Sequence, residues 1–207
     1  MFYFVKTPWF LKKLYPSCIW DLPVNEKIIY LTFDDGPHPS ITPLVLDMLN
    51  EYKAKATFFC IGKNVVKNPQ LYKRILMEGH RVGNHTYNHV NGWKIADRDY
   101  LENIYEASKF IDSDLFRPPY GKISHFQIAC LTKKKPNFKV IMWDVLSADF
   151  DQKTTVEKCI SNVINNASAG SVVVFHDSEK ASVRMRETLP RTLDYFSKLG
   201  YKFDVIR

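Results

Sequence analysis

The chain has 207 residues, a formal net charge of +7 and 45% hydrophobic residues. This length supports one sizeable core rather than two full domains, and the composition is that of a globular protein rather than a disordered one. The lysines are scattered apart from one run at residues 133–135, which stops at Pro136 and is typical of a solvated loop or helix end, so we expect no nucleic-acid partner. A weak preference for acidic polymers fits the charge better.

The first 27 residues form an extension ahead of the regular pattern. They are rich in aromatic residues and hold Lys6, Lys12 and Lys13. They lack the uninterrupted apolar stretch and the small-residue cleavage site of a secretory signal, and no stretch of the chain reaches the roughly 18 apolar residues of a membrane span. We therefore expect residues 1–27 to cap the domain, with lying on a membrane surface as the weaker alternative. A cytoplasmic or membrane-associated location follows.

From Lys27 onward, strand-like apolar runs alternate with helical patterns. The strand-like runs are residues 28–33, 56–61, 80–83, 115–116, 139–145, 172–175 and 201–206. The helical patterns are residues 42–52, 65–77, 97–111, 123–132, 155–165 and 185–198. This alternation predicts an α/β fold, a distorted (β/α) barrel of about seven strand–helix units over residues 28–207. An open doubly wound sheet is the alternative, although no Gly-rich phosphate loop follows the first strand.

Two histidines four residues apart, His85 and His89, follow a short strand-like run. We expect a helical turn there, which would present both imidazoles on one face. Asp34 and Asp35 end the first strand-like run, and neighbouring strand residues point to opposite faces, so one carboxylate can join the histidines. Two imidazoles and Asp35 leave a coordination position open, as a catalytic zinc ion requires. Cobalt, nickel or iron also suits this ligand set, and zinc is our first choice for a single divalent ion.

Each motif taken alone also fits a structural role, as a polar turn or a buried histidine pair. Four segments, however, occur together in one order: residues 32–37 (TFDDGP), 85–89 (HTYNH), 117–121 (RPPYG) and 172–177 (VVVFHD). In this order they resemble the polysaccharide deacetylases, the NodB homology domain or carbohydrate esterase family 4, over roughly residues 28–206. The resemblance implies a distorted barrel of seven or eight strands and the removal of acetyl groups from sugar polymers.

The resemblance also implies distinct roles for the residues of the first three segments. Asp34 matches the catalytic base, and Asp35 matches the metal-binding aspartate. His85 and His89 match the two metal-binding histidines. Arg117 matches the arginine that pairs with the base and keeps it ionised.

Three further residues match the side of the family site that receives the acetyl group. Tyr120 matches the residue whose backbone N–H stabilises the oxyanion. Val174 stands where the family has a leucine that lines the pocket for the acetyl methyl group. His176 matches the general acid.

The chain departs from the family pattern between residues 143 and 151. Leu146 stands where we expect the family's first aspartate, which tunes the general-acid histidine. Asp149 matches the second aspartate and Phe150 replaces a tryptophan. Without a carboxylate at position 146, we expect His176 to lose its proton at lower pH than in a typical member. Asp144 is a possible substitute, although its spacing differs.

The sequence thus predicts a metal-dependent hydrolase that removes N- or O-linked acetyl groups from a carbohydrate polymer or oligosaccharide. The alternative is a catalytically weak or inactive carbohydrate-binding protein on the same fold, which Leu146 favours. The partner expected in either case is an acetylated carbohydrate. The identity of the polymer, the choice between N- and O-acetyl groups and the oligomeric state stay open.

Overall fold

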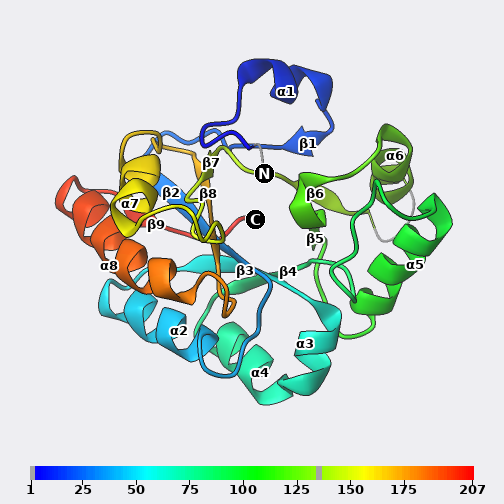
Figure 1. Cartoon of the computed structure of the whole chain (residues 1–207), viewed down its shortest axis with the longest axis horizontal. Coiled ribbons are helices and arrows are strands. Elements are labelled where there is room, and N and C mark those ends of the chain that lie inside the picture. The colour runs from blue at the N-terminus through cyan, green and yellow to red at the C-terminus, as the bar shows by residue number, and fades with distance from the viewer. Residues whose placement is uncertain (1–2, 134–136) are drawn as a thin grey trace.

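The computed structural model describes residues 3–133 and 137–207 and shows a curled sheet of parallel strands with helices packed around it (Figure 1). The strands are β1 (Cys18–Ile19), β2 (Ile28–Asp34), β3 (Ala56–Cys60), β4 (Arg81–Asn84), β5 (Leu115–Phe116), β6 (Lys139–Ile141), β7 (Val145–Leu146), β8 (Val172–His176) and β9 (Lys202–Phe203). The helices are α1 (Trp9–Leu14), α2 (Thr42–Glu51), α3 (Gly62–Lys67), α4 (Pro69–Met77), α5 (Asp97–Ser108), the 3₁₀ turn η1 (Pro119–Gly121), α6 (His125–Lys133), α7 (Val156–Ile164) and α8 (Ser182–Lys198). The strand order is β1-β6-β5-β4-β3-β2-β8-β7, and β9 pairs with the start of β2. The predicted distorted barrel is therefore confirmed, and the open doubly wound alternative is wrong.

The middle strands are buried on both faces. β3 is buried along its whole length, and so is β8 as far as Phe175. Phe33 stacks on Phe58 and on Phe175, with ring centroids 5.1 and 5.9 Å apart, beneath the helices. Parallel strands covered in this way read as continuous hydrophobic runs, which is why they were easy to predict. This rigid sheet fixes the positions of the residues that follow each strand.

Three predicted elements are wrong in extent. The helix expected over residues 65–77 is two helices, because the residue before a proline avoids helical backbone and Asn68, before Pro69, has φ −128° and ψ 55°. The strand expected over residues 139–145 is also two: β6 pairs with β5, whereas β7 pairs with β8. The strand expected over residues 201–206 is limited to β9.

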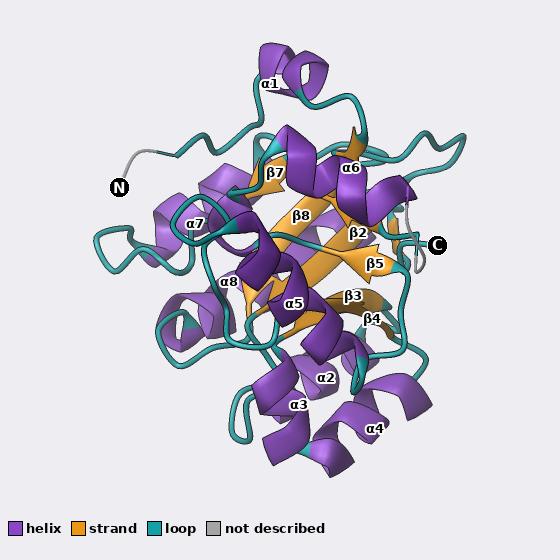
Figure 2. Ribbon diagram, turned by 90° about the vertical axis from the view of Figure 1, so that its right-hand side faces the viewer, coloured by secondary structure: helices purple, strands orange, loops and turns teal. Residues whose placement is uncertain are grey.

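Residues 3–20, which we call the N-terminal arm, connect the two ends of the sheet. The carbonyl of Val5 accepts a 2.8 Å hydrogen bond from the Leu146 N–H, beside β7. At the other end of the arm, β1 pairs with β6. Helix α1, between these contacts, stands out from the rest of the molecule (Figure 2). The arm thus spans the gap in the barrel between β7 and β6.

Asp144 anchors this arm. Its carboxylate accepts hydrogen bonds from Lys6 at 2.5 Å, from Lys12 at 2.9 Å and from the Ser171 hydroxyl at 2.6 Å. The idea that Asp144 substitutes as a partner of His176 is therefore wrong, because both of its oxygens are engaged elsewhere. Within the described residues, none of the helices has the length and apolarity needed to cross a membrane.

Candidate active site

Parallel strands bring their carboxyl ends to one edge of the sheet, and the predicted site residues gather there. Asp34 and His176 are register partners at the ends of β2 and β8. His85 follows β4 and Arg117 follows β5, and these strands are neighbours in the sheet. Segments far apart in sequence therefore meet because each follows a strand.

Asp35, His85 and His89 form a cluster suited to a metal ion. One ligand atom from each residue lies within 4.8 Å of the other two. The Asp35 Oδ1 lies 3.1 Å from the His89 Nε2 and 3.8 Å from the His85 Nε2. The expected helical turn is wrong, however: the segment is a loop in which Thr86 and His89 have φ values of 64° and 58°. This loop, rather than a helix face, brings the two imidazoles together.

The protonation states of this cluster suit cation binding. The His85 Nδ1 donates to the Arg117 carbonyl at 2.8 Å, which leaves the Nε2 as the free ligand atom. Burial lowers the pKa of His85 to about 4, so its ring is neutral near pH 7. Burial opposes ionisation of Asp35, but nearby His89 and the positive charge of His176 lower the pKa of that carboxyl. The Asp35 Oδ1 is buried without a hydrogen-bond partner among the described residues, so the donor set fits a divalent ion.

Asp34 is held by a buried arginine. The Arg117 Nη1 donates to the Asp34 Oδ1 at 2.7 Å, and Arg117 is fully buried. The same nitrogen donates to the Thr32 hydroxyl at 2.6 Å. The other guanidinium nitrogens donate to the carbonyls of Ile141 and Met142. The guanidinium is therefore fixed in place, and it holds the Asp34 carboxylate in one orientation.

His176 has a carboxylate partner, and it is Asp149. The His176 Nδ1 lies 2.7 Å from the Asp149 Oδ1, and the His176 backbone N–H donates to the Asp149 Oδ2 at 2.8 Å. Although burial opposes it, the Asp149 charge raises the pKa of His176 to about 9. The expectation that Leu146 leaves His176 without a tuning carboxylate is therefore wrong. Leu146 instead lines the pocket.

Asp34, the three residues of the metal cluster and His176 line one pocket of about 660 Å³. Tyr120 and Val174 also line it, and the Tyr120 ring packs against His89 with centroids 4.7 Å apart. Tyr120 has φ 60°, and Gly121 follows with φ 64°. A β-carbon at Gly121 would lie 2.6 Å from the Trp143 ring, so only glycine allows this loop to pack so closely.

Sequence reasoning gave no role to Asp177, which supports the loop after β2. This carboxylate is fully buried and accepts hydrogen bonds from the Gly36 N–H at 3.0 Å and from the Thr42 hydroxyl. Gly36 is required by the contact, because a β-carbon there would lie 2.0 Å from the Asp177 Oδ2. Asp177 thus holds the turn that carries Asp35. The position of Asp177 directly after His176, at the end of a strand, was the feature of the sequence that could have pointed to a role at the site.

The comparisons with known proteins agree with this geometry. A family profile described as polysaccharide deacetylase matches residues 21–134. A peptidoglycan-N-acetylglucosamine deacetylase of Bacillus cereus is 38% identical over 200 residues, covering 93% of each chain. A chitooligosaccharide deacetylase of Azorhizobium caulinodans is 36% identical over 160 residues, covering 74% of this chain and 75% of its own.

A solved structure shares the whole fold. A peptidoglycan N-acetylglucosamine deacetylase, crystallised with a naphthalenyl N-hydroxybenzamide, superimposes with a TM-score of 0.87 at 31% identity. The match covers 97% of this chain and 95% of that one. Fold, order of motifs and sequence identity lead to one conclusion: the chain belongs to the polysaccharide deacetylase family.

Proposed function

We propose that this protein is a metal-dependent hydrolase that removes N- or O-linked acetyl groups from a carbohydrate polymer or oligosaccharide. The observation that carries the proposal is the juxtaposition of an arginine-held Asp34 with the Asp35, His85 and His89 cluster in one pocket. A protein that only bound sugars would have no need of a buried, arginine-paired carboxylate beside a metal-binding cluster. The names of the relatives, which act on peptidoglycan and chitooligosaccharides, support glucosamine-containing glycans as the first substrates to test.

Asp35, His85 and His89 would hold the ion, with zinc the first choice. A divalent ion bound there would polarise the acetyl carbonyl and lower the pKa of water at the site. The open side of the cluster faces the pocket, where the substrate has access.

Asp34 serves as the general base in this proposal. Its carboxylate, oriented by Arg117, takes the proton from the water that attacks the acetyl carbon. The backbone N–H of Tyr120 is assigned to the oxyanion that develops, and Val174 to the wall that contacts the acetyl methyl group. These assignments follow the family motifs and the position of both residues in the pocket.

His176 serves as the general acid. Asp149 keeps it protonated near neutral pH, so that it can donate a proton to the departing sugar nitrogen or oxygen. The products are then acetate and the deacetylated sugar. The alternative of an inactive sugar-binding protein depended on a missing partner for His176, and the Asp149 contact removes its basis.

Acetate release tests this function. The purified protein is incubated with peptidoglycan, N-acetylated chito-oligosaccharides and O-acetylated xylan, and free acetate is measured. We expect release from at least one glycan, and release at least about 100-fold slower from the Asp34→Asn variant. Binding of a glycan without acetate release by the wild type would support the sugar-binding alternative instead.

A further inference from the structure

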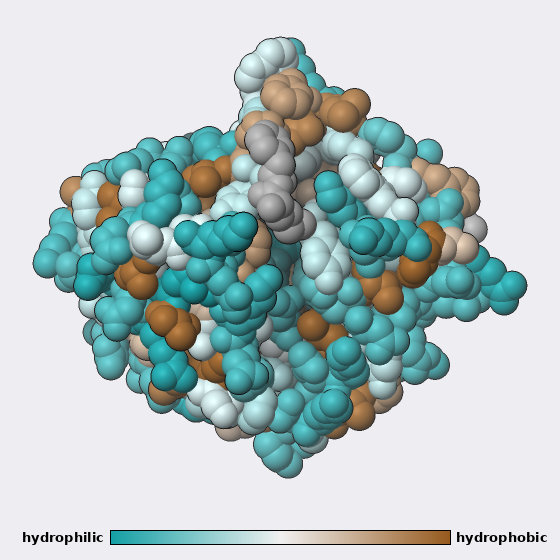
Figure 3. All heavy atoms as spheres, in the orientation of Figure 1, coloured by the Kyte–Doolittle hydropathy of each residue, from teal (hydrophilic) through white to brown (hydrophobic). Residues whose placement is uncertain are grey.

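The N-terminal arm forms one side of the pocket that holds the candidate active site. Tyr3, Phe4 and Leu14 line the same pocket as Asp35 and His176. Exposed hydrophobic side chains gather on the arm, at the top of the face shown in Figure 3. None of these arm residues has a part in the reaction proposed above. The pocket therefore extends beyond the residues to which the reaction assigns a role.

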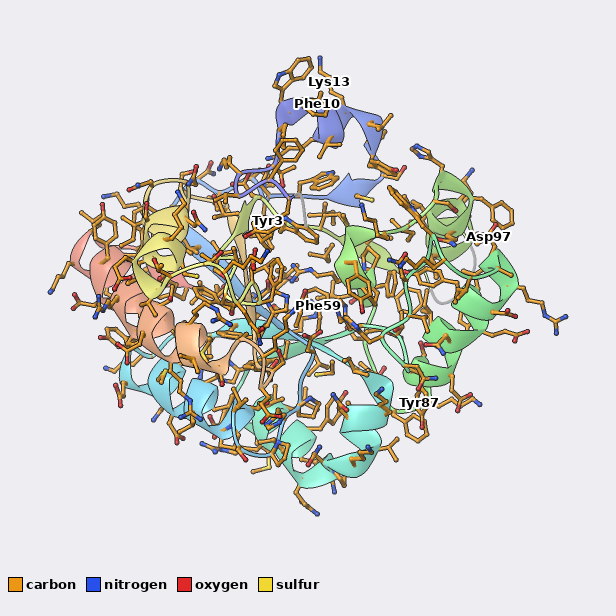
Figure 4. The ribbon with its side chains drawn as sticks, in the orientation of Figure 1. Tyr3, Phe10, Lys13, Phe59, Tyr87 and Asp97 are labelled. Atoms are coloured by element: carbon orange, nitrogen blue, oxygen red, sulfur yellow. The ribbon has the colours of Figure 1, made fainter. Side chains whose placement is uncertain are left out.

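A row of aromatic rings connects the arm to the general acid. The Tyr3 and Phe150 rings meet edge to face with centroids 5.4 Å apart, and Phe150 meets the His176 ring at 5.1 Å. The Tyr3 hydroxyl donates to the Asp151 carboxylate at 2.9 Å. In Figure 4, Tyr3 lies close to the strands, whereas Phe10 and Lys13 lie on the outer side of α1. A single ring, that of Phe150, thus lies between Tyr3 of the arm and His176.

The arm is fixed to the barrel by specific polar contacts. The Thr7 hydroxyl donates to the Trp143 carbonyl at 2.7 Å, and the Thr7 N–H donates to the Asp144 carbonyl at 2.8 Å. Lys6 and Lys12 hold the Asp144 carboxylate. An arm held in this way presents a preformed surface, so a ligand would not have to order it on binding.

Two exposed aromatic residues, Trp93 and Tyr120, also line this pocket. Trp93 is 58% exposed and Tyr120 is 49% exposed, and the Lys122 ammonium lies 4.2 Å from the centre of the Trp93 ring. Sugar rings have apolar faces that pack on aromatic and aliphatic side chains, while their hydroxyl groups point outward to water or to polar side chains. A pocket lined both by apolar side chains of the arm and by exposed aromatic rings suits a sugar ring next to the acetylated one.

We propose that the N-terminal arm is a sugar-binding element, in which Phe4 and Leu14 hold a neighbouring sugar unit of the chain whose acetyl group is removed. This inference rests on the proposed deacetylase function for the identity of the ligand. It predicts that the protein prefers oligosaccharides to the single sugar, and that the arm is the source of this preference.

The test compares two wall variants with a control on the same arm. Phe4→Ala and Leu14→Ala remove wall side chains, whereas Trp9→Ala removes a larger side chain that is 68% exposed and lies outside the pocket lining. For each protein, KM and kcat are measured for N-acetylglucosamine and for its β-1,4-linked tetramer. Binding of the tetramer is measured separately by calorimetry, and thermal unfolding checks the fold.

We expect each wall variant to raise KM for the tetramer about fivefold to tenfold, the scale of one lost aromatic or aliphatic contact, with kcat and the single-sugar kinetics unchanged. The conservative variant Phe4→Tyr keeps the aromatic ring and should have the wild-type KM for the tetramer. Trp9→Ala should have the wild-type KM for both substrates. Equal losses on both substrates, an unchanged KM for the tetramer, or an equal effect of Trp9→Ala would overturn the role of the arm.

The calorimetry separates the two proposals. If the wild type released no acetate but wall variants bound the tetramer several-fold more weakly, the deacetylase function would fail and the sugar-binding arm would stand. If the wild type released acetate with no preference for the tetramer and bound it no better than the single sugar, the arm proposal alone would fail.

Discussion

The Asp149 carboxylate lies 2.7 Å from the His176 Nδ1 and also accepts a hydrogen bond from the His176 backbone N–H. The contact with the Nδ1 orients the imidazole ring and leaves the Nε2 as the nitrogen that can donate a proton to the substrate. The negative charge favours the imidazolium form, which raises the pKa of His176 to about 9 despite burial. The carboxylate partner of the proposed general acid thus lies three positions beyond residue 146, where we expected it.

Replacing this partner should move the alkaline limb of the activity profile. In Asp149→Asn the amide keeps the shape but removes the charge, so the pKa of His176 falls and the acid loses its proton at lower pH. Activity should decline from a lower pH than in the wild type, with most activity kept on the acid side. The pH dependence of kcat/KM measures this shift.

Asp144→Asn is the matched control, because Asp144 binds Lys6, Lys12 and Ser171 rather than His176. Its alkaline limb should coincide with that of the wild type. A limb that moved in Asp144→Asn but not in Asp149→Asn would contradict the pairing seen in the structure.

Metal content should depend on His89. His89→Ala removes one of three ligands, so stoichiometric metal should be lost from the purified protein. Elemental analysis of wild type and variant measures this directly. His125→Ala makes the same change at an exposed residue outside the cluster and should keep its metal. Full occupancy in His89→Ala would exclude His89 as a ligand.

The two neighbouring aspartates should give different phenotypes. Asp34→Asn should keep the metal and lose about 100- to 10,000-fold in kcat, the usual range of a general base. Asp35→Asn should bind metal more weakly, and added metal should restore part of its activity. Titration of each variant with Zn²⁺, followed by acetate release, separates them. Identical behaviour of both variants would show that their roles are not distinct.

Arg117 should matter for folding as well as for catalysis. Arg117→Ala leaves the Asp34 charge buried and two carbonyls without donors, so the free energy of unfolding should fall by about 3–5 kcal/mol. Arg98→Ala removes a solvent-exposed helix pair with Glu102 and should change the free energy of unfolding far less. Urea denaturation compares the two variants. Similar losses in both would mean that the buried pair contributes no more than a surface one.

The sequence predicted the barrel because parallel strands buried on both faces give runs such as β3 and β8 that stand out from their surroundings. It predicted which residues would gather, since Asp34, His85 and Arg117 each follow a strand. The prediction from sequence was wrong where the backbone conformation of a loop, rather than a helix or strand, determines how side chains meet. The loop at His85 takes left-handed conformations at Thr86 and His89 that spacing does not reveal.

The partner of His176 was missed for a similar reason. Spacing counts residues along a strand, but Asp149 reaches His176 from beyond the end of β7, where Ala148 has φ 65°. The path of the N-terminal arm was equally hidden, because Val5 and β1 contact strands more than 120 residues away in sequence. Long-range contacts made by short, irregular segments leave no periodic pattern to read.

The central claim is that hydrolysis occurs at the Asp35, His85 and His89 cluster with Asp34 as the base. The most direct test measures acetate release from N-acetylglucosamine oligomers and metal content on the same sample, before chelation, after chelation and after Zn²⁺ is added back. We expect release that falls with metal content and returns with it, and release at least about 100-fold slower at every stage for Asp34→Asn. A wild-type sample with one bound metal per chain that released no acetate from any acetylated glycan, or release that persisted without metal, would contradict it.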